Sequence, residues 1–164
     1  MVNHRGMLGI VTNVACLHKK VAPAFPGVDY QREVSSMFTY LLTHKSLGLA
    51  ANQLGFDVRL VLIPIRGAMT PLFNPEVVAH SDDRDISYEA CLSIPGKVSR
   101  VRRFSRVTLR AIAKRGLNVE FTLVGPEAWV AQHEVDHLDG ILMTDREREV
   151  NFDGRLDKSF GTKP

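Results

Sequence analysis

The stretch "QHEVDHLDG", residues 132–140, decides the fold of this chain, because it contains the pattern His-Glu-x-x-His. On a helix, His133 and His137 are four residues apart and share one face. Two imidazoles on one face can hold a metal ion, and Glu134 can reach a water bound to that ion. Two ligands do not complete a site, so the rest of the chain must supply a third.

The residues around this pattern predict the helix independently. Gly125-Pro126 is a typical helix start with Pro in its first turn, and Gly140 is a typical helix end. Trp129 and Val130 precede His133 by one turn on the same side, which predicts a buried face. Burying two histidines there without partners would be costly, so we expect metal ligands. The alternative is a pair of hydrogen-bonded core histidines.

The third ligand has both downstream and upstream candidates. One class of zinc protease needs a histidine where this chain has Met143, and Glu147 and Glu149 follow too closely to return on a second helix. Upstream, "YEACLSIPG" (88–96) places Cys91 where a predicted strand ends. A thiolate binds borderline-soft metals such as zinc and iron well, and a Cys/His/His set leaves one coordination position open.

A predicted helix near the N-terminus supplies part of the core. Residues 30–44 carry apolar side chains at helical spacing, and Asp29 is a plausible N-cap. The residues expected in the core are Val34, Met37, Phe38, Leu41 and Leu42.

Strand patterns fill most of the remaining chain. "VRLVLIPI" (58–65) predicts a buried strand that stops at Pro64, and an alternating pair around Gly116 predicts a hairpin. The other predicted strands lie near 70–80 and 85–89, and the hairpin strands at 105–114 and 118–124. The expected fold class is α+β, with antiparallel or mixed β-strands around a buried central helix. Residues 1–164 form one predicted domain, with a flexible tail from about 147 to 164.

Bulk composition sets limits on partners. The chain has 164 residues, 45% hydrophobic and 24% charged, with a net charge of +3. No apolar run is long enough for a membrane helix, and the charge alone does not indicate DNA. The acid-poor N-terminus is better explained by a first strand and loop at 9–17 than by a targeting tag. The two cysteines, Cys16 and Cys91, are too far apart to indicate a disulfide.

A third stretch, "SLGLAANQLGF" (46–56), combines small residues with one amide side chain. Gly48 permits close backbone approach, and Gln53 offers a hydrogen-bond donor, which together suit a narrow slot for a small carbonyl group. Taken alone, a turn leading into the strand at 58 is the better interpretation.

Together, and in this order, the three stretches resemble peptide deformylase. The family motifs Gly-x-Gly-x-Ala-Ala-x-Gln, Glu-Gly-Cys-x-Ser and Gln-His-Glu-x-x-His stand here as "SLGLAANQ" (46–53), "EACLS" (89–93) and "QHEVDH" (132–137). The resemblance implies removal of the N-formyl group from the initiator methionine of nascent polypeptides. It also implies one divalent metal ion, with Fe²⁺ as the native metal and Zn²⁺ or Ni²⁺ able to substitute.

The resemblance assigns roles residue by residue. Glu134 matches the general acid/base, and Gln53 and the backbone N–H of Leu92 match the donors to the formyl oxygen. The matched metal ligands are Cys91, His133 and His137. The matched substrate-binding positions are Gly48, Leu47, Trp129 and Val130.

Two positions depart from the family motifs. Ser46 and Ala90 stand where the family has glycine; if position 90 needed a positive φ, Ala90 would be strained by about 1 kcal/mol. The short motif spacing resembles the compact, Gram-negative-like form of the family. The resemblance implies formylmethionyl peptides as partners and the cytoplasm as location, with an organelle as the alternative. The ribosome is a weaker candidate partner, because the tail does not resemble a long docking helix.

Two rival functions remain at this point. A metal amidase or peptidase acting on another N-acyl group would use the same residues. A low-activity homologue acting as a binding protein could use the basic stretch "SRVRRFSRV" (99–107) to touch RNA or a ribosomal surface. For that stretch, the solvated face of a strand is the better interpretation.

Overall fold

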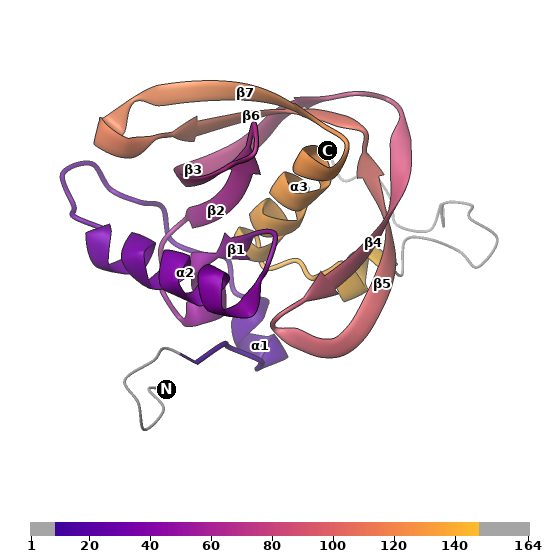
Figure 1. Cartoon of the computed structure of the whole chain (residues 1–164), viewed down its shortest axis with the longest axis horizontal. Coiled ribbons are helices and arrows are strands. Elements are labelled where there is room, and N and C mark those ends of the chain that lie inside the picture. The colour runs from indigo at the N-terminus through magenta and orange to yellow at the C-terminus, as the bar shows by residue number, and fades with distance from the viewer. Residues whose placement is uncertain (1–8, 148–164) are drawn as a thin grey trace.

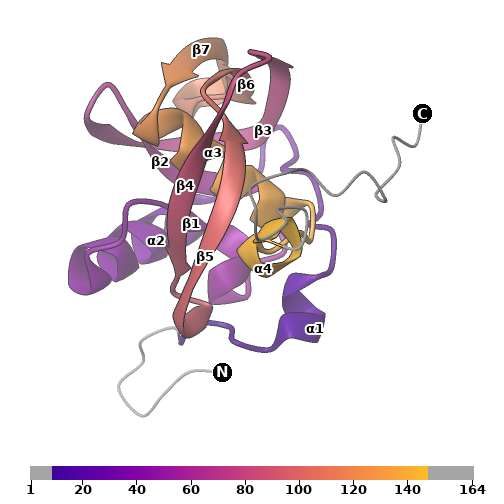
Figure 2. The same cartoon turned by 90° about the vertical axis from the view of Figure 1, so that its right-hand side faces the viewer.

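The computed structural model describes residues 9–147, in which helix α3 (Pro126–Leu138) lies between two antiparallel β-layers (Figures 1 and 2). The larger layer has strand order β1-β2-β3-β6-β7, and the smaller layer is the β4–β5 ribbon. The sheet strands are β1 (Leu49–Ala50), β2 (Leu60–Ile65), β3 (Ala68–His80), β6 (Arg106–Ile112) and β7 (Asn118–Val124). The ribbon strands are β4 (Arg84–Cys91) and β5 (Ile94–Phe104). The predicted α+β class, with strands around a buried helix, is confirmed.

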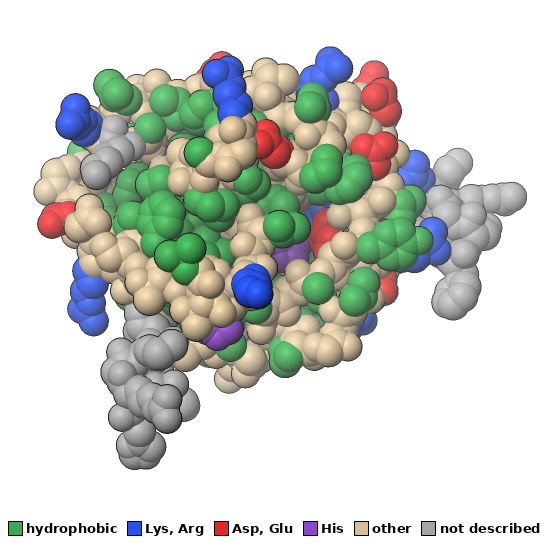
Figure 3. All heavy atoms as spheres, viewed as in Figure 1, with side chains coloured by type: hydrophobic (Ala, Val, Ile, Leu, Met, Phe, Trp, Pro, Cys, Tyr) green, Lys and Arg blue, Asp and Glu red, His purple; other side chains and the backbone are tan. Residues whose placement is uncertain are grey.

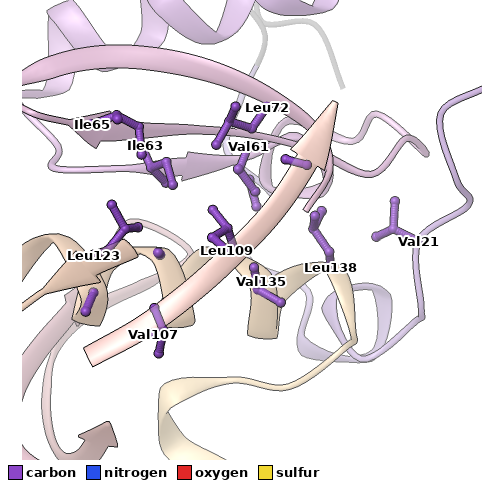
Figure 4. Close-up of a cluster of buried hydrophobic side chains, with 14 residues drawn as sticks. Val21, Val61, Ile63, Ile65, Leu72, Val107, Leu109, Leu123, Val135 and Leu138 are labelled. Carbon is purple, nitrogen blue, oxygen red and sulfur yellow. The ribbon is translucent and has the colours of Figure 1, made fainter. Parts of the chain in front are cut away.

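Helix α3 packs on one face of the sheet through a continuous apolar core (Figure 4). Val135 and Leu138 of the helix meet strand residues that include Val61, Ile63 and Leu109. The helix begins after Gly125, whose φ of 55° and ψ of −133° suit glycine, and Pro126 follows at its first position. This packing fixes which face of α3 turns toward the ribbon.

Strand β2 is buried on both faces, which explains its unbroken apolar sequence. Its odd-numbered residues Val61, Ile63 and Ile65 face α3, and Leu60 and Leu62 belong to a second core under helix α2 (Gln31–His44). Side chains alternate between the faces of a strand, so one strand serves both cores. The strand ends at Ile65 and contains Pro64, so the predicted stop at Pro64 is wrong. β1 pairs only with Val61 and Leu62, and Pro64 therefore lies where β2 has a single strand neighbour.

Helix α2 covers the second core, with two departures from prediction. Met37 and Leu41 are buried as expected, but Leu42 is 80% exposed, because the apolar stripe of α2 is narrower than the sequence suggested. Tyr30, rather than Asp29, is the residue at the N-cap. Asp29 still performs part of that role, since its Oδ1 accepts a hydrogen bond from the backbone N–H of Gln31 at 2.9 Å.

The remaining differences lie near the termini and in the ribbon. A short helix, α1 (Val14–Leu17), replaces the first strand predicted at 9–17, and the Asn13 side chain accepts from the N–H of Ala15 at its start. α4 (Met143–Glu147) is a short helix that follows α3. The flexible tail predicted at 147–164 lies outside the described residues apart from Glu147. None of the described helices is both long and apolar enough to cross a membrane.

The ribbon differs most from its sequence-based description. β5 is a separate strand of 11 residues, and its side chains alternate between the helix side and solvent. Arg103 points inward and is only 3% exposed, so the basic stretch at 99–107 is not simply a solvated face. Between the strands is a short turn that follows Cys91, where the ladder register shifts. Figure 2 shows the ribbon crossing in front of α3.

Candidate metal centre

Three side chains predicted as metal ligands meet between α3 and the ribbon. Their ligand atoms, one each from Cys91, His133 and His137, all lie within 4.8 Å of one another. Cys91 Sγ and His137 Nε2 are 3.2 Å apart. Cys91 is 42 positions from His133 and 46 positions from His137 in the sequence. The fold brings the three together, because β4 ends at Cys91 and one face of α3 carries both histidines.

The donor set fits a divalent cation. Bond lengths of about 2.3 Å to sulfur and 2.0–2.1 Å to nitrogen in a tetrahedron place the ligand atoms about 3.5 Å apart. That spacing agrees with the observed cluster. Burial strongly lowers the pKa of His137, which leaves its imidazole neutral and able to bind a cation. His133 is different. Burial lowers its pKa, but hydrogen bonds with Cys91 and Glu89 outweigh burial and raise the pKa to about 10. Its surroundings therefore favour positive charge.

A buried network of charged side chains holds His133 in place. None of these charged residues was predicted from the sequence to be part of the site. His133 Nδ1 lies 2.9 Å from Glu89 Oε2, which leaves Nε2 toward the cluster. Arg103 donates to both oxygens of Glu89, at 2.8 and 2.9 Å, and also to Asp136. Arg146 donates to the other oxygen of Asp136 at 2.7 Å. Such partners fix the orientation of a ligating imidazole.

Two of these residues had a weak signal in the sequence. Glu89 sits in the cysteine motif and Asp136 in the histidine motif, and each is an acidic residue close in sequence to a predicted metal ligand. Burial raises the pKa of Glu89, but hydrogen bonds from His133 and Arg103 outweigh it and lower the pKa to about 2. Arg103 could not be assigned, because nothing local distinguishes it from the neighbouring Arg100 and Arg102.

The Gln53 amide is oriented toward the same cluster. Its Oε1 accepts from the backbone N–H of Ala50 at 2.9 Å, so its Nε2 faces the other way. Nε2 lies 3.4 Å from Cys91 Sγ and 3.2 Å from Ser93 Oγ. The 3₁₀ turn η1 (Ala51–Leu54) places this side chain. A hydrogen-bond donor is thus held beside the ligands. Leu92, directly after Cys91, lines the same cavity.

Glu134 and Gly48 are in close contact, which explains the glycine. A Cβ atom at position 48 would lie 2.7 Å from Glu134 Oε1 and 2.7 Å from Val130 Cγ1, too close for any side chain. Among the described residues, Glu134 Oε2 is buried without a hydrogen-bond partner. Burial raises the pKa of Glu134 to about 7, and the negative charge of Glu89 adds to this effect, while His133 opposes it. A carboxylate with one unused oxygen therefore lies in the wall of the cavity that Cys91 and His133 also line.

A cavity of about 630 Å³ opens from the cluster to the surface. All four predicted substrate-binding residues line it: Leu47, Gly48, Trp129 and Val130. In Figure 3 a histidine side chain is visible inside a hollow bordered by hydrophobic side chains. The Trp129 ring lines this cavity while its Nε1 is buried without a partner in the described chain. The structure therefore places every predicted site residue in or beside one cavity.

The two departures from the family motifs cause no backbone strain. Neither Ser46 nor Ala90 is among the residues with positive φ, so the strain considered for Ala90 does not arise. Ser46 Oγ donates to the carbonyl of Gly48 at 2.9 Å, a bond that glycine could not make. Ala90 is exposed and lines the cavity.

Other cysteine and histidine residues lie outside the cluster. Cys16 is exposed and unpaired, and no disulfide is present between it and Cys91. His18, His44 and His80 are exposed. His4 lies outside the described residues.

A cysteine and two histidines around one point, with a carboxylate and an amide beside them, define a metal-dependent hydrolase. The family model described as "Polypeptide deformylase" matches residues 10–152. A peptide deformylase from Natranaerobius thermophilus is 35% identical over 144 residues, covering 86% of this chain and 92% of the relative. A peptide deformylase from Treponema pallidum is 37% identical over 123 residues, covering 75% and 76%. The chain belongs to the polypeptide deformylase family.

Solved structures agree with this assignment. The peptide deformylase of Thermotoga maritima has a TM-score of 0.80 and 30% identity, covering 85% of this chain and 97% of that one. A class I type b peptide deformylase from Acinetobacter baumannii has a TM-score of 0.80 and 27% identity, covering 85% and 99%. The fold around α3 is therefore that of solved members of the family, and the chain is a metal-binding hydrolase.

Proposed function

We propose that this protein removes the N-formyl group from the N-terminal formylmethionine of nascent polypeptides and releases formate. One observation carries the proposal: the ligand atoms of Cys91, His133 and His137 meet at one point beside Glu134. Family membership supplies the reaction, and this convergence supplies residues of this chain that can perform it.

The three ligands would hold one divalent cation. When bound, such an ion polarises the substrate carbonyl and makes a water molecule a stronger nucleophile near neutral pH. Ferrous iron is our proposal for the native metal, with zinc or nickel able to occupy the same ligands. The single thiolate of Cys91 supports a borderline-soft ion of this group over magnesium or calcium.

Side-chain and backbone groups of the protein transfer the proton and stabilise the charge that develops on the carbonyl oxygen. Glu134 takes a proton from the attacking water and returns it to the departing amine, a role supported by its Oε2, which has no hydrogen-bond partner within residues 9–147. Gln53 Nε2, whose direction is set by the bond to Ala50, donates to the carbonyl oxygen as it gains negative charge. The backbone N–H of Leu92 is the second donor. Removal of one such donor typically costs about 2.7–4 kcal/mol of transition-state stabilisation.

Selectivity for formyl follows from the space at Gly48. Gly48 packs so tightly on Glu134 and Val130 that an added Cβ atom would lie 2.7 Å from each side chain, and we propose that the formyl carbon, which carries only hydrogen, binds beside this packed region. An acetyl methyl group would collide there. We propose that Leu47, Val130 and Trp129 bind the methionine side chain, since all three line the cavity and are apolar.

Family membership also supports proposals for the extent of the catalytic domain, its location and its partners. The whole chain, 1–164, acts as one catalytic domain in the bacterial-type cytoplasm. Its substrates are formylmethionyl peptides that emerge during translation, which makes the ribosome a candidate partner.

The decisive measurement is formate release from a formyl-methionyl peptide by anaerobically purified protein, with iron, zinc and nickel measured on the same sample. Glu134→Ala should lower kcat/KM by about 10²–10⁴-fold, because the general acid/base is lost. Metal content should not change, since Glu134 is not a ligand. Glu120→Ala, which removes an exposed carboxylate on β7, is the control and should retain full activity.

Three results would contradict the proposal. Full activity of Glu134→Ala would remove Glu134 from its role. Equal cleavage of acetyl- and formyl-methionyl peptides would favour the rival function, a metal amidase acting on other N-acyl groups. Intact protein with bound metal and no formate release would favour the binding-protein alternative.

A further inference from the structure

The inner face of β4 carries one hydroxyl group that the reaction described above does not use. Ser87 shares this face with Glu89 and Cys91, because side chains alternate along a strand. Ser87 is only 5% exposed, and it lines the cavity of about 630 Å³. Its hydroxyl has no hydrogen-bond partner within residues 9–147. A buried hydroxyl in a cavity wall is costly unless a ligand supplies the missing partner.

The contacts between β4 and α3 follow a regular spacing where the ribbon crosses in front of the helix (Figure 2). Cys91 Sγ lies 3.2 Å from His137 Nε2, and Glu89 Oε2 lies 2.9 Å from His133 Nδ1. Two residues of a strand advance by about 6.7 Å, and four residues of a helix advance by about 6 Å. The strand and the helix therefore run alongside each other in step over this stretch.

The next position in this spacing pairs Ser87 with Trp129. Both residues line the cavity, which agrees with that pairing. Ser87 lies four residues, or about 13 Å, along β4 from Cys91. The hydroxyl is thus well away from the metal ligands and beside the ring that we assign to the methionine side chain. It is placed to contact the end of that side chain.

The charged groups nearest to Ser87 on the same strand are already paired. Glu89 accepts hydrogen bonds from Arg103 on both of its oxygens, and its Oε2 also contacts His133. The Ser87 hydroxyl has no such commitment and can donate one hydrogen bond. A neutral atom with lone pairs is therefore the ligand group that complements this part of the wall.

We propose that the Ser87 hydroxyl donates a hydrogen bond to the end of the substrate's first side chain, so that the protein also deformylates peptides that begin with formyl-methionine sulfoxide. This role rests on the proposed deformylase function and specifies its substrates. The thioether sulfur of methionine is only a weak acceptor, whereas oxidation to the sulfoxide adds a polar oxygen at the same position. A wholly apolar pocket would exclude that oxygen, because it would lose its water without replacement.

The chemical step is the same hydrolysis for both side chains. Water adds across the formyl amide, the carbon–nitrogen bond breaks, and formate and a free amine result. The sulfur keeps its oxidation state throughout, so no oxidant or reductant is needed. Ser87 therefore acts on substrate choice and not on bond cleavage.

The test compares three formyl peptides that differ only in the first side chain: methionine, methionine sulfoxide, and norleucine, which has a methylene group in place of sulfur. Formate release with matched metal content gives kcat/KM, and the two sulfoxide epimers are assayed separately. The unmodified protein should cleave one epimer within about tenfold of the methionine peptide. Ser87→Ala should lower kcat/KM about tenfold for that epimer, by less than about threefold for methionine, and not at all for norleucine.

Ser99→Ala is the matched control, because it makes the same change on the neighbouring strand. The Ser99 hydroxyl donates to Glu147 Oε2 at 3.2 Å, and Ser99 is not among the residues that line the cavity. This variant should keep the relative kcat/KM values of the three peptides. Unchanged sulfoxide cleavage by Ser87→Ala, or an equal loss for all three peptides, would overturn the proposal.

Failure of the underlying function gives a different result. If methionine and norleucine peptides are cleaved but neither sulfoxide epimer is, the role of Ser87 is refuted and the deformylase function stands. If no formyl peptide is cleaved, the deformylase function fails. Calorimetric titration with the same peptides then tests Ser87 alone: Ser87→Ala should bind the sulfoxide peptide about tenfold more weakly and the norleucine peptide equally well. Equal binding of the sulfoxide peptide by both proteins would overturn the proposal.

Discussion

The inner and outer faces of the β4–β5 ribbon carry the same residue type in opposite circumstances. Arg103 on the inner face is buried and contacts Glu89 and Asp136, whereas Arg100 on the outer face is exposed. Three positions along one strand thus separate a structural charge from a solvent-facing one. The lesson is that arginines must be assigned by the face they occupy, because neither their number nor their spacing shows which one orients a metal ligand.

The largest expected effect tests this contrast directly. Arg103→Met should lower the free energy of unfolding by about 3–5 kcal/mol, because Glu89 and Asp136 would be left as uncompensated buried charges. Arg100→Met, the same change on the outer face, should stay within about 0.5 kcal/mol. Urea denaturation of the two variants gives the comparison. Similar losses for both would show that the two faces do not differ as described.

The next effect concerns the cavity on the inner side. Gly48→Ala should reduce kcat/KM for a formyl-methionyl peptide by about a hundredfold, because the new methyl group displaces the Glu134 carboxylate. Ser46→Ala, in the same loop, removes only the hydrogen bond to the Gly48 carbonyl and should cost less than about threefold. Steady-state kinetics with matched metal content measures both. Unchanged kcat/KM for Gly48→Ala would mean that the loop moves away at little cost.

A smaller effect tests the link from the network to the metal. Glu89→Gln keeps the side-chain size but removes the charge that holds His133, so metal affinity should fall by about 10–100-fold. Competition with a chromophoric chelator gives the zinc dissociation constant. Circular dichroism checks that the variant is folded, and Glu120→Gln serves as a surface control. An unchanged constant would show that Glu89 stabilises the fold without orienting the ligand.

The smallest effect concerns Ala90, an exposed residue that lines the cavity. Ala90→Gly restores the family residue but relieves no strain, since φ at position 90 is not positive. We expect kcat/KM to change by less than about threefold and stability to fall by about 0.5–1 kcal/mol, the usual cost of glycine in a strand. A large gain in activity would show that the Ala90 methyl group obstructs the peptide.

The sequence predicted what depends on local pattern. Helix α3 and the face that carries its ligands were predicted correctly, because both depend on residues close together in the sequence. His133 and His137 have helical spacing, Pro126 is typical of a helix start, and Gly140 is typical of a helix end. Cys91 was found by elimination and then by resemblance to a family. The alternation around Gly116 likewise predicted the β6–β7 hairpin.

What the sequence missed depends on distant partners. Arg103 is identified only by two carboxylates 14 and 33 residues away, which no local pattern reveals. Leu42 fits the helical spacing but lies beyond the edge of the surface that α2 covers. Pro64 is accommodated because β1 is too short to reach it, and the length of a neighbouring strand cannot be read from the proline itself.

Strand β2 contributes side chains to both cores, and it therefore couples their unfolding. Val61 and Ile63 support α3, while Leu60 and Leu62 support α2, on opposite sides of one backbone. Neither core can unfold alone without exposing the side of β2 that packs in the other core, so partial unfolding should be rare. The metal ligands are then protected by the cooperativity of the entire domain, and amide protons of β2 should be among the slowest to exchange with deuterium.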